Sequence, residues 1–156
     1  MALKVGDKAP DFTMYDFDRK PRSLKEFLGK KLVIAFYPGA FTGVCTKEMC
    51  TFRDSLAALN TVNAQVVAAS TDSPFANKAF ADQNRLNFTV LSDVLKDASQ
   101  KYGGLYDGFA GIPGFQASKR SVFVLDPSGT VTYAWISDNP GVEPNYDEVR
   151  KAVNSI

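Results

Sequence analysis

The chain contains two cysteines, Cys45 and Cys50, and no histidine. Cys45 follows an apolar run, a Pro-Gly turn and a threonine, so it falls in the first turn of an expected helix. Free backbone N–H groups and the positive end of the helix dipole meet at such a position, and both favour the thiolate form of a cysteine. Because the thiolate is the nucleophilic form, this placement predicts a reactive Cys45.

The absence of histidine excludes several kinds of site. Ser-His-Asp and Cys-His nucleophilic sites need an imidazole as the base. Zinc and non-haem iron sites that contain histidine are excluded in the same way, and two cysteines alone make a poor structural zinc site. We therefore expect no metal and no other cofactor, and we expect a permanent cation and backbone dipoles to stabilise the Cys45 thiolate.

Three further residues could support Cys45. Thr42 lies three residues earlier and offers a hydroxyl, while Pro38 has no N–H, fixes the loop and can shield the thiolate. Arg120 immediately precedes an expected strand, so it should project from a strand end near the same edge of the sheet. An arginine stays charged and presents a planar fork of donors, which suits the stabilisation of a reacting thiolate.

The elements that position these residues alternate along the chain. Apolar runs and turn residues predict strands at residues 32–37, 65–70, 88–91, 121–125 and 130–136. Helices are expected from the cap Thr42 to about residue 59, and at 74–84, 93–102 and 145–154. This order predicts an α/β, thioredoxin-like fold, with a mixed central β-sheet and helices on both faces. Sites in such sheets lie at the carboxyl ends of parallel strands, where the Cys45 loop begins.

The stretch 102–115 is rich in glycine but matches neither phosphate-loop nor dinucleotide-binding spacing. We interpret it as a flexible loop that borders the site with Phe109, Ile112 and Phe115.

Size and composition limit the remaining possibilities. The 156 residues fit a single domain, 1–156. With 18 basic and 17 acidic side chains, the chain shows no basic stripe for nucleic acid. Its longest apolar run, residues 32–37, is far shorter than the roughly 20 residues of a membrane span. The N-terminus lacks a signal-peptide layout, so we expect a cytoplasmic protein, either a monomer or a small homodimer.

The residues around Cys45 resemble a known family. The arrangement Pro38-x-x-x-Thr42-x-x-Cys45 is similar to the peroxiredoxin signature, and so are residues 5–12 and 88–93, so the likeness covers nearly the whole chain. It implies a thiol-dependent peroxidase that reduces hydrogen peroxide and organic hydroperoxides through a cysteine sulfenic acid.

The resemblance also implies a role for each residue. It makes Cys45 the peroxidatic cysteine, with Thr42 and Pro38 beside it in the site. Arg120 falls where the family places its catalytic arginine, and Glu48 falls where it places the glutamate that holds this arginine.

The spacing Cys45-x-x-x-x-Cys50 resembles the peroxiredoxin Q group, also called bacterioferritin comigratory protein. This implies that Cys50 resolves the sulfenic acid as an intramolecular disulfide, which thioredoxin or a similar dithiol protein then reduces. The Gly43-Val44-Cys45 context and the C-terminal half also resemble one-cysteine, AhpE-like peroxiredoxins, in which an external thiol performs that step.

Helix geometry bears on this choice. Residues five apart on a helix have Cα atoms about 8 to 9 Å apart, beyond the roughly 7 Å limit for a disulfide. If Cys50 resolves Cys45, the first turns of the helix must therefore unwind in each cycle. Gly39 and Gly43 lie where such a hinge is easy.

Two other functions remain open from the sequence. A thioredoxin-type disulfide oxidoreductase normally uses Cys-x-x-Cys, which this chain lacks. A redox-sensing or holdase-like protein would consume peroxide stoichiometrically rather than catalytically.

Overall fold

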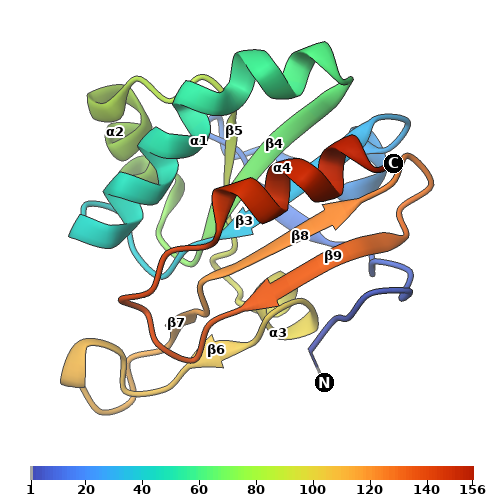
Figure 1. Ribbon diagram of the computed structural model, residues 1–156. Coiled ribbons are helices and arrows are strands. Elements are labelled where there is room, and N and C mark those ends of the chain that lie inside the picture. Colours follow the sequence, from blue (N-terminus) through green and yellow to red (C-terminus); the bar gives the residue numbers. More distant parts are fainter. Residues whose placement is uncertain (1) are drawn as a thin grey trace.

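The computed structural model describes residues 2–156, with the side chains of residues 56 and 57 excepted. A mixed seven-stranded sheet lies at its centre, in the order β2-β1-β5-β4-β3-β8-β9 (Figure 1). The bounds of these strands are β1 Thr13–Tyr15, β2 Pro21–Ser23, β3 Lys31–Phe36, β4 Ala64–Ser70, β5 Thr89–Ser92, β8 Ser121–Leu125 and β9 Val131–Ile136.

The middle of the sheet is parallel, because two helical crossovers connect β3 to β4 and β4 to β5. Strand β3 pairs in parallel with β4, and β4 pairs in parallel with β5, whereas β8 runs antiparallel on the other side of β3. Helices cover both faces of these strands, which explains why their sequences read as continuous apolar runs rather than as alternating ones.

Three helices cover one face: α1 Gly43–Thr61, α2 Pro74–Asn84 and α4 Tyr146–Asn154. The short helix α3 Asp97–Lys101 and the 3-10 helix η1 Leu24–Phe27 pack on the opposite face. This arrangement confirms the predicted thioredoxin-like fold. Within residues 2–156, no helix is both long and apolar enough to cross a membrane.

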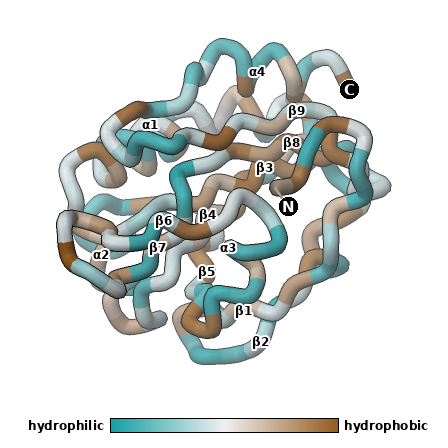
Figure 2. The backbone as a smooth tube through the Cα atoms, turned by 90° about the horizontal axis from the view of Figure 1, so that it is seen from below, coloured by the Kyte–Doolittle hydropathy of each residue, from teal (hydrophilic) through white to brown (hydrophobic). Residues whose placement is uncertain are grey.

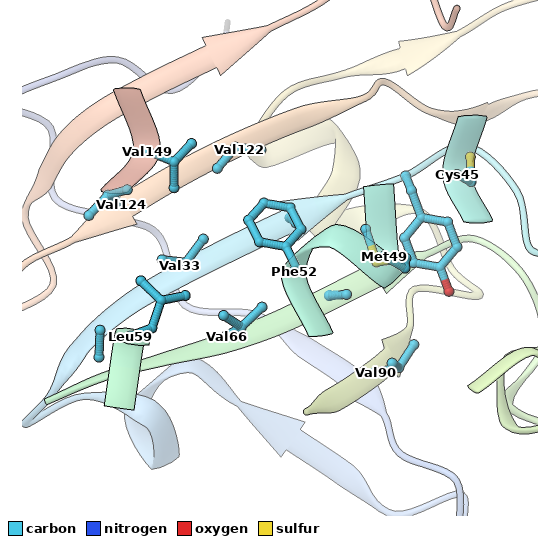
Figure 3. Close-up of a cluster of buried hydrophobic side chains, with 14 of the residues drawn as sticks. Val33, Cys45, Met49, Phe52, Leu59, Val66, Val90, Val122, Val124 and Val149 are labelled. Carbon is cyan, nitrogen blue, oxygen red and sulfur yellow. The ribbon is translucent and has the colours of Figure 1, made fainter. Parts of the chain in front are cut away.

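Alternate residues of β3 point into two separate cores. Val33 and Ala35 join the core beneath α1, α2 and α4, whereas Leu32, Ile34 and Phe36 join the core on the α3 side. Figure 2 shows hydrophobic colouring along the central strands and a mixture of hydrophobic and hydrophilic residues along α4. Figure 3 shows the first core, with Cys45 at one end of it on the first turn of α1.

The predicted strands and helices agree with the structure to within one or two residues at most positions. The exception is the helix expected at 93–102, which begins only at Asp97. Residues 93–96 form a turn instead, with Lys96 in the left-handed region at φ 65°. The Asp93 carboxylate accepts the peptide N–H groups of Ala98 and Ser99, and it thereby caps the shorter helix.

Some short elements were not predicted. The hairpin of β1 and β2 is one, and the small two-stranded sheet of β6 Leu105–Tyr106 and β7 Ala117–Ser118 is another. Strands of two or three residues carry no measurable periodicity, so the sequence gives no signal for them. The β6–β7 pair closes the predicted glycine-rich loop, which contains the 3-10 helix η2 Phe109–Gly111.

Candidate active site

Cys45 is fully buried in the first turn of α1, directly after the loop that leaves β3. Thr42 occupies the N-cap position, and its carbonyl accepts the N–H of Thr46 at 2.9 Å. Its hydroxyl donates to the carbonyl of Gly39 at 2.8 Å and does not cap the helix. Thr42 therefore fixes the bend of the loop, and the N–H groups of the first turn remain free of a side-chain cap.

Sheet register brings Arg120 to Cys45. Strand β8 pairs antiparallel with β3, and Phe36 at the carboxyl end of β3 faces Ser121 at the start of β8. Arg120 immediately precedes Ser121, so it lies at the edge from which the Cys45 loop departs. Its Nη2 lies 3.2 Å from Cys45 Sγ, as the predicted position at a strand end requires.

The guanidinium of Arg120 makes three further hydrogen bonds. Nη1 donates to Glu48 Oε1 at 2.8 Å, while Nε and Nη2 donate to the carbonyl of Pro140 at 3.0 and 2.7 Å. The side chain is therefore held on three sides, by α1, by the loop that leads to α4, and by the sulfur itself. This is the kind of positioning that a fork of fixed donors allows.

The charge on Arg120 is buried and paired. Burial alone lowers the pKa of Arg120, but the negative charges of Cys45 and Glu48 outweigh it and leave that pKa raised. Arg120 therefore stays cationic at every pH that matters for function. Removing one member of such a buried group leaves the others uncompensated.

Glu48 is fully buried on α1, one turn beyond Cys45. Its Oε1 accepts from Arg120, whereas its Oε2 has no hydrogen-bond partner among the described residues. Burial raises the pKa of Glu48 to about 7, against the opposing charge and hydrogen bond of Arg120. Glu48 therefore changes charge close to neutral pH.

Replacing Glu48 with glutamine should make the stability difference between variant and wild type depend on pH. Below about pH 4.5, the group is protonated in both folded and unfolded wild-type chains. Between there and about pH 7 only the folded chain keeps the proton, so wild-type stability relative to Glu48→Gln should fall as pH rises. The total change should reach up to about 3 kcal/mol, at 1.36 kcal/mol per pKa unit. Urea unfolding of both proteins at pH 4.5, 6 and 8 measures it, and a constant difference contradicts it.

Tyr106 positions the backbone of Arg120. Its hydroxyl accepts the Arg120 N–H at 3.2 Å and donates to the carbonyl of Ser137 at 2.6 Å. The N–H of Ser137 in turn donates to the carbonyl of Arg120 at 2.9 Å. The sequence could not predict this role of Tyr106, because its hydrogen bonds join β6 to residues next to β8 and β9, which are distant in the sequence.

A cleft of about 500 Å³ opens beside the Cys45 loop. Pro38 and Thr42 line it, as do Phe109 and Phe115 of the glycine-rich loop. The prediction that this loop borders the site is therefore right for the two phenylalanines. It is wrong for Ile112, which directly follows η2, is exposed to solvent and does not line the cleft.

A buried polar network holds the floor of the loop. The N–H of Ala40 donates to the Asp72 carboxylate at 2.8 Å, and the Ser70 hydroxyl donates to the same carboxylate at 2.7 Å. The Tyr37 hydroxyl donates to Asn77 Oδ1 at 2.5 Å. Burial raises the pKa of Tyr37 well above its ordinary value, so it stays a neutral donor.

Cys50 lies apart from this group. It is half-buried on the same helix, which is continuous from Gly43 to Thr61, and both thiols are free. Its Sγ donates to Asn84 Oδ1 on α2 at 3.7 Å, whereas Cys45 faces Arg120. The structure thus brings Cys45, Glu48 and Arg120 into contact, with Thr42 and Pro38 at the adjoining cleft, and leaves Cys50 in different surroundings.

Comparisons with known proteins agree with this site. The AhpC/TSA family matches residues 5–134. The chloroplastic peroxiredoxin Q of Populus jackii is 38% identical over 154 residues, covering 99% of this chain and 70% of the relative. A putative peroxiredoxin bcp of Coxiella burnetii is 34% identical over 135 residues, covering 86% of this chain and 89% of the relative.

Solved structures give the same result. The peroxidoxin BcpB of Mycobacterium tuberculosis superposes with a TM-score of 0.86 at 30% identity, covering 99% of this chain and 98% of that one. A peroxiredoxin-like protein of Aquifex aeolicus gives 0.85 at 31% identity, covering 99% and 88%. The chain therefore belongs to the AhpC/TSA family, with peroxiredoxin Q and Bcp-type relatives, and is a thiol-dependent peroxidase.

Proposed function

We propose that Cys45 is the thiol on which the peroxide is reduced. The contact of 3.2 Å between Arg120 Nη2 and Cys45 Sγ, inside a buried site, carries this proposal. A cation in this place stabilises the thiolate before the reaction. It also lies close to where negative charge develops on the leaving oxygen during the reaction, and preorganised charge of this kind is effective in a site that excludes water.

In the proposed step the Cys45 thiolate attacks the terminal oxygen of the hydroperoxide. A sulfur–oxygen bond forms as the O–O bond breaks, and the sulfur supplies the two electrons that reduce the peroxide. The other oxygen leaves, takes a proton from solvent and departs as water or an alcohol. Cys45 becomes a sulfenic acid, the first and reversible stage of cysteine oxidation.

The neighbouring residues have supporting roles in this proposal. Glu48 holds one arm of the Arg120 guanidinium, so that the other arm faces the sulfur. The Thr42 hydroxyl borders the cleft and can turn from Gly39 to an oxygen of the bound peroxide. Pro38 is buried, lines the cleft and has no N–H, so it shields the sulfur from water. The cleft is large enough for hydrogen peroxide and for organic hydroperoxides.

For the second step, we propose that Cys50 resolves the sulfenic acid. The Cys50 thiol displaces the hydroxyl of the Cys45 sulfenic acid, which gives an intramolecular disulfide and one molecule of water. The helix is continuous between the two cysteines, so its first turns must unwind before the disulfide can form. Gly39 in the loop and Gly43 at the start of the helix can serve as the hinge. A thioredoxin-like dithiol protein then reduces this disulfide to two thiols and is itself oxidised to a disulfide.

A second candidate is a one-cysteine cycle, in which an external thiol reduces Cys45. The observation that favours it is that α1 is a continuous helix that includes both cysteines, and that the Cys50 thiol is hydrogen-bonded to Asn84 of α2. A redox-sensing protein without turnover is the third candidate, and catalytic loss of peroxide in the presence of a dithiol reductant separates it from both enzymes.

Oxidation of the reduced protein with one equivalent of hydrogen peroxide should give an intramolecular disulfide. Intact-mass analysis should show the loss of two hydrogens in the wild type. It should show the gain of one oxygen in Cys50→Ser, which keeps the nucleophile but cannot resolve it. Hydrogen exchange of the oxidised wild type should show weaker amide protection over residues 42–53 than the reduced form. Recovery of Cys50 as a free thiol after stoichiometric oxidation supports the one-cysteine cycle instead.

We also propose that the protein works in the cytoplasm, where thiols are kept reduced, as a monomer or a small homodimer. The balanced charge of the chain supports neither a nucleic-acid partner nor a membrane surface.

A further inference from the structure

One residue of α2 contacts α1 at two points around Cys50. Asn84, the last residue of α2, accepts the Cys50 thiol on its side-chain Oδ1 at 3.7 Å. Its backbone carbonyl accepts Nη1 of Arg53 at 2.7 Å. Cys50 and Arg53 are three residues apart on α1 and so lie on the same face of the helix. We call this pair of contacts the Asn84 clasp.

The clasp is held in a defined orientation. Nδ2 of Asn84 donates to the carbonyl of Phe80 at 2.9 Å, and this bond directs Oδ1 of the same amide toward Cys50. The backbone carbonyl of Asn84 belongs to the last turn of α2, where carbonyls lack partners within the helix. Arg53 supplies that partner from α1, and its Nε is held by Asp54 at 2.9 Å. The Asn84 amide and the Arg53 guanidinium are therefore both held in place by contacts that do not involve Cys50.

In the contact between Cys50 and Asn84, the thiol must be the hydrogen-bond donor. An amide oxygen can only accept a hydrogen bond, so the contact needs the protonated thiol as its donor. The thiolate, which is the form that attacks a sulfenic acid, cannot make it. The clasp therefore favours the position that Cys50 has in the wound helix.

We propose that Asn84 is a positioning residue that sets how fast Cys50 reaches oxidised Cys45. This rests on the proposed resolving role of Cys50. The sulfenic acid on Cys45 has two fates: the Cys50 thiol displaces its hydroxyl as water, or a second peroxide oxidises it to sulfinic acid and is itself reduced to water or alcohol. The hydrogen bond between the Cys50 thiol and Asn84 must break before the first fate is possible. A stronger clasp therefore leaves the sulfenic acid exposed to the second peroxide for longer.

The test compares Asn84→Ala with Asn84→Asp. Alanine removes the acceptor, so disulfide formation after stoichiometric oxidation should accelerate about two- to tenfold, the effect of one ordinary hydrogen bond. The sulfinic acid fraction at excess peroxide should fall by a similar factor. Aspartate keeps an acceptor oxygen for the thiol but loses the Nδ2 donor to Phe80, so its disulfide rate should rise less than that of the alanine variant. Arg53→Ala, which releases the clasp from its backbone side, should also accelerate the step.

The matched control is Lys78→Ala. It removes the exposed ion pair with Asp82 on α2 and leaves the clasp intact, so it should not change the partition between disulfide and sulfinic acid. Rapid quenching with acid, alkylation and peptide mass analysis give both products in each variant.

The outcomes separate the two proposals. If wild type forms no intramolecular disulfide, the resolving role of Cys50 fails. If wild type forms it and Asn84→Ala reacts at the wild-type rate, or alanine and aspartate accelerate it equally, the clasp is overturned and the resolving role stands.

Discussion

Cys45→Ser should abolish peroxide turnover and leave the fold intact. Serine is close in size to cysteine, and its hydroxyl can accept the hydrogen bond from Arg120 that the sulfur accepts now. A serine hydroxyl is not ionised near neutral pH and has no base beside it, since the chain contains no histidine. The expected turnover with a dithiol reductant is below about one per cent of wild type.

The control for this variant is Cys50→Ser. Without any reductant it should still consume one equivalent of peroxide per chain, whereas Cys45→Ser should consume none. Thermal unfolding by circular dichroism checks that both variants are folded. Residual turnover in Cys45→Ser above that limit would remove Cys45 from the proposed role.

Arg120→Lys should lose far more activity than conservation of charge suggests. Arg120 makes four hydrogen bonds from three nitrogens, and they reach Cys45, Glu48 and the Pro140 carbonyl. A lysine has one nitrogen and cannot hold its position against α1 and the following loop while also facing the sulfur. Loss of one strong interaction of the transition state corresponds to about 2–4 kcal/mol, or roughly thirty- to a thousandfold in rate.

The second-order rate constant for oxidation of Cys45, measured by stopped flow with excess peroxide, reports this loss directly. Lys119→Ala is the matched control, because it changes the neighbouring residue and removes only a surface ion pair with Asp138. Exposed pairs of that kind contribute little, so its rate should stay within about twofold of wild type. A change of less than about threefold in Arg120→Lys contradicts a role for Arg120 in the transition state.

Local pattern was enough to predict the first turn of α1 and the strand that leads to it. A Pro-Gly turn after an apolar run, followed by a capping threonine, defines the strand–loop–helix unit of Cys45 without any knowledge of the remaining chain. Arg120 could be placed as well, because its position before an apolar strand leaves few alternatives once the order of elements is known. The contact with Glu48 came from family resemblance and not from spacing.

The residues that escaped prediction act through distant or backbone atoms. The Pro140 carbonyl and the Tyr106 hydroxyl meet Arg120, and the Asn84 amide meets Cys50, across elements far apart in sequence. Every residue has a backbone carbonyl, so no pattern of residue types can predict which carbonyl will accept a hydrogen bond from Arg120. The late start of α3 has a similar cause, since it depends on the Asp93 carboxylate accepting two peptide N–H groups downstream.

The distance along the chain between Arg120 and Cys45 has a consequence for folding. The two residues are 75 positions apart, and they meet only through the pairing of β3 with β8. The entropy of closing such a loop must be offset before the contact stabilises the fold, and topologies rich in such contacts fold slowly. A chain emerging from the ribosome, or one denatured by heat, therefore has a Cys45 without its cation. The cation that we propose for the reactivity of Cys45 therefore reaches the sulfur only when the tertiary structure is complete.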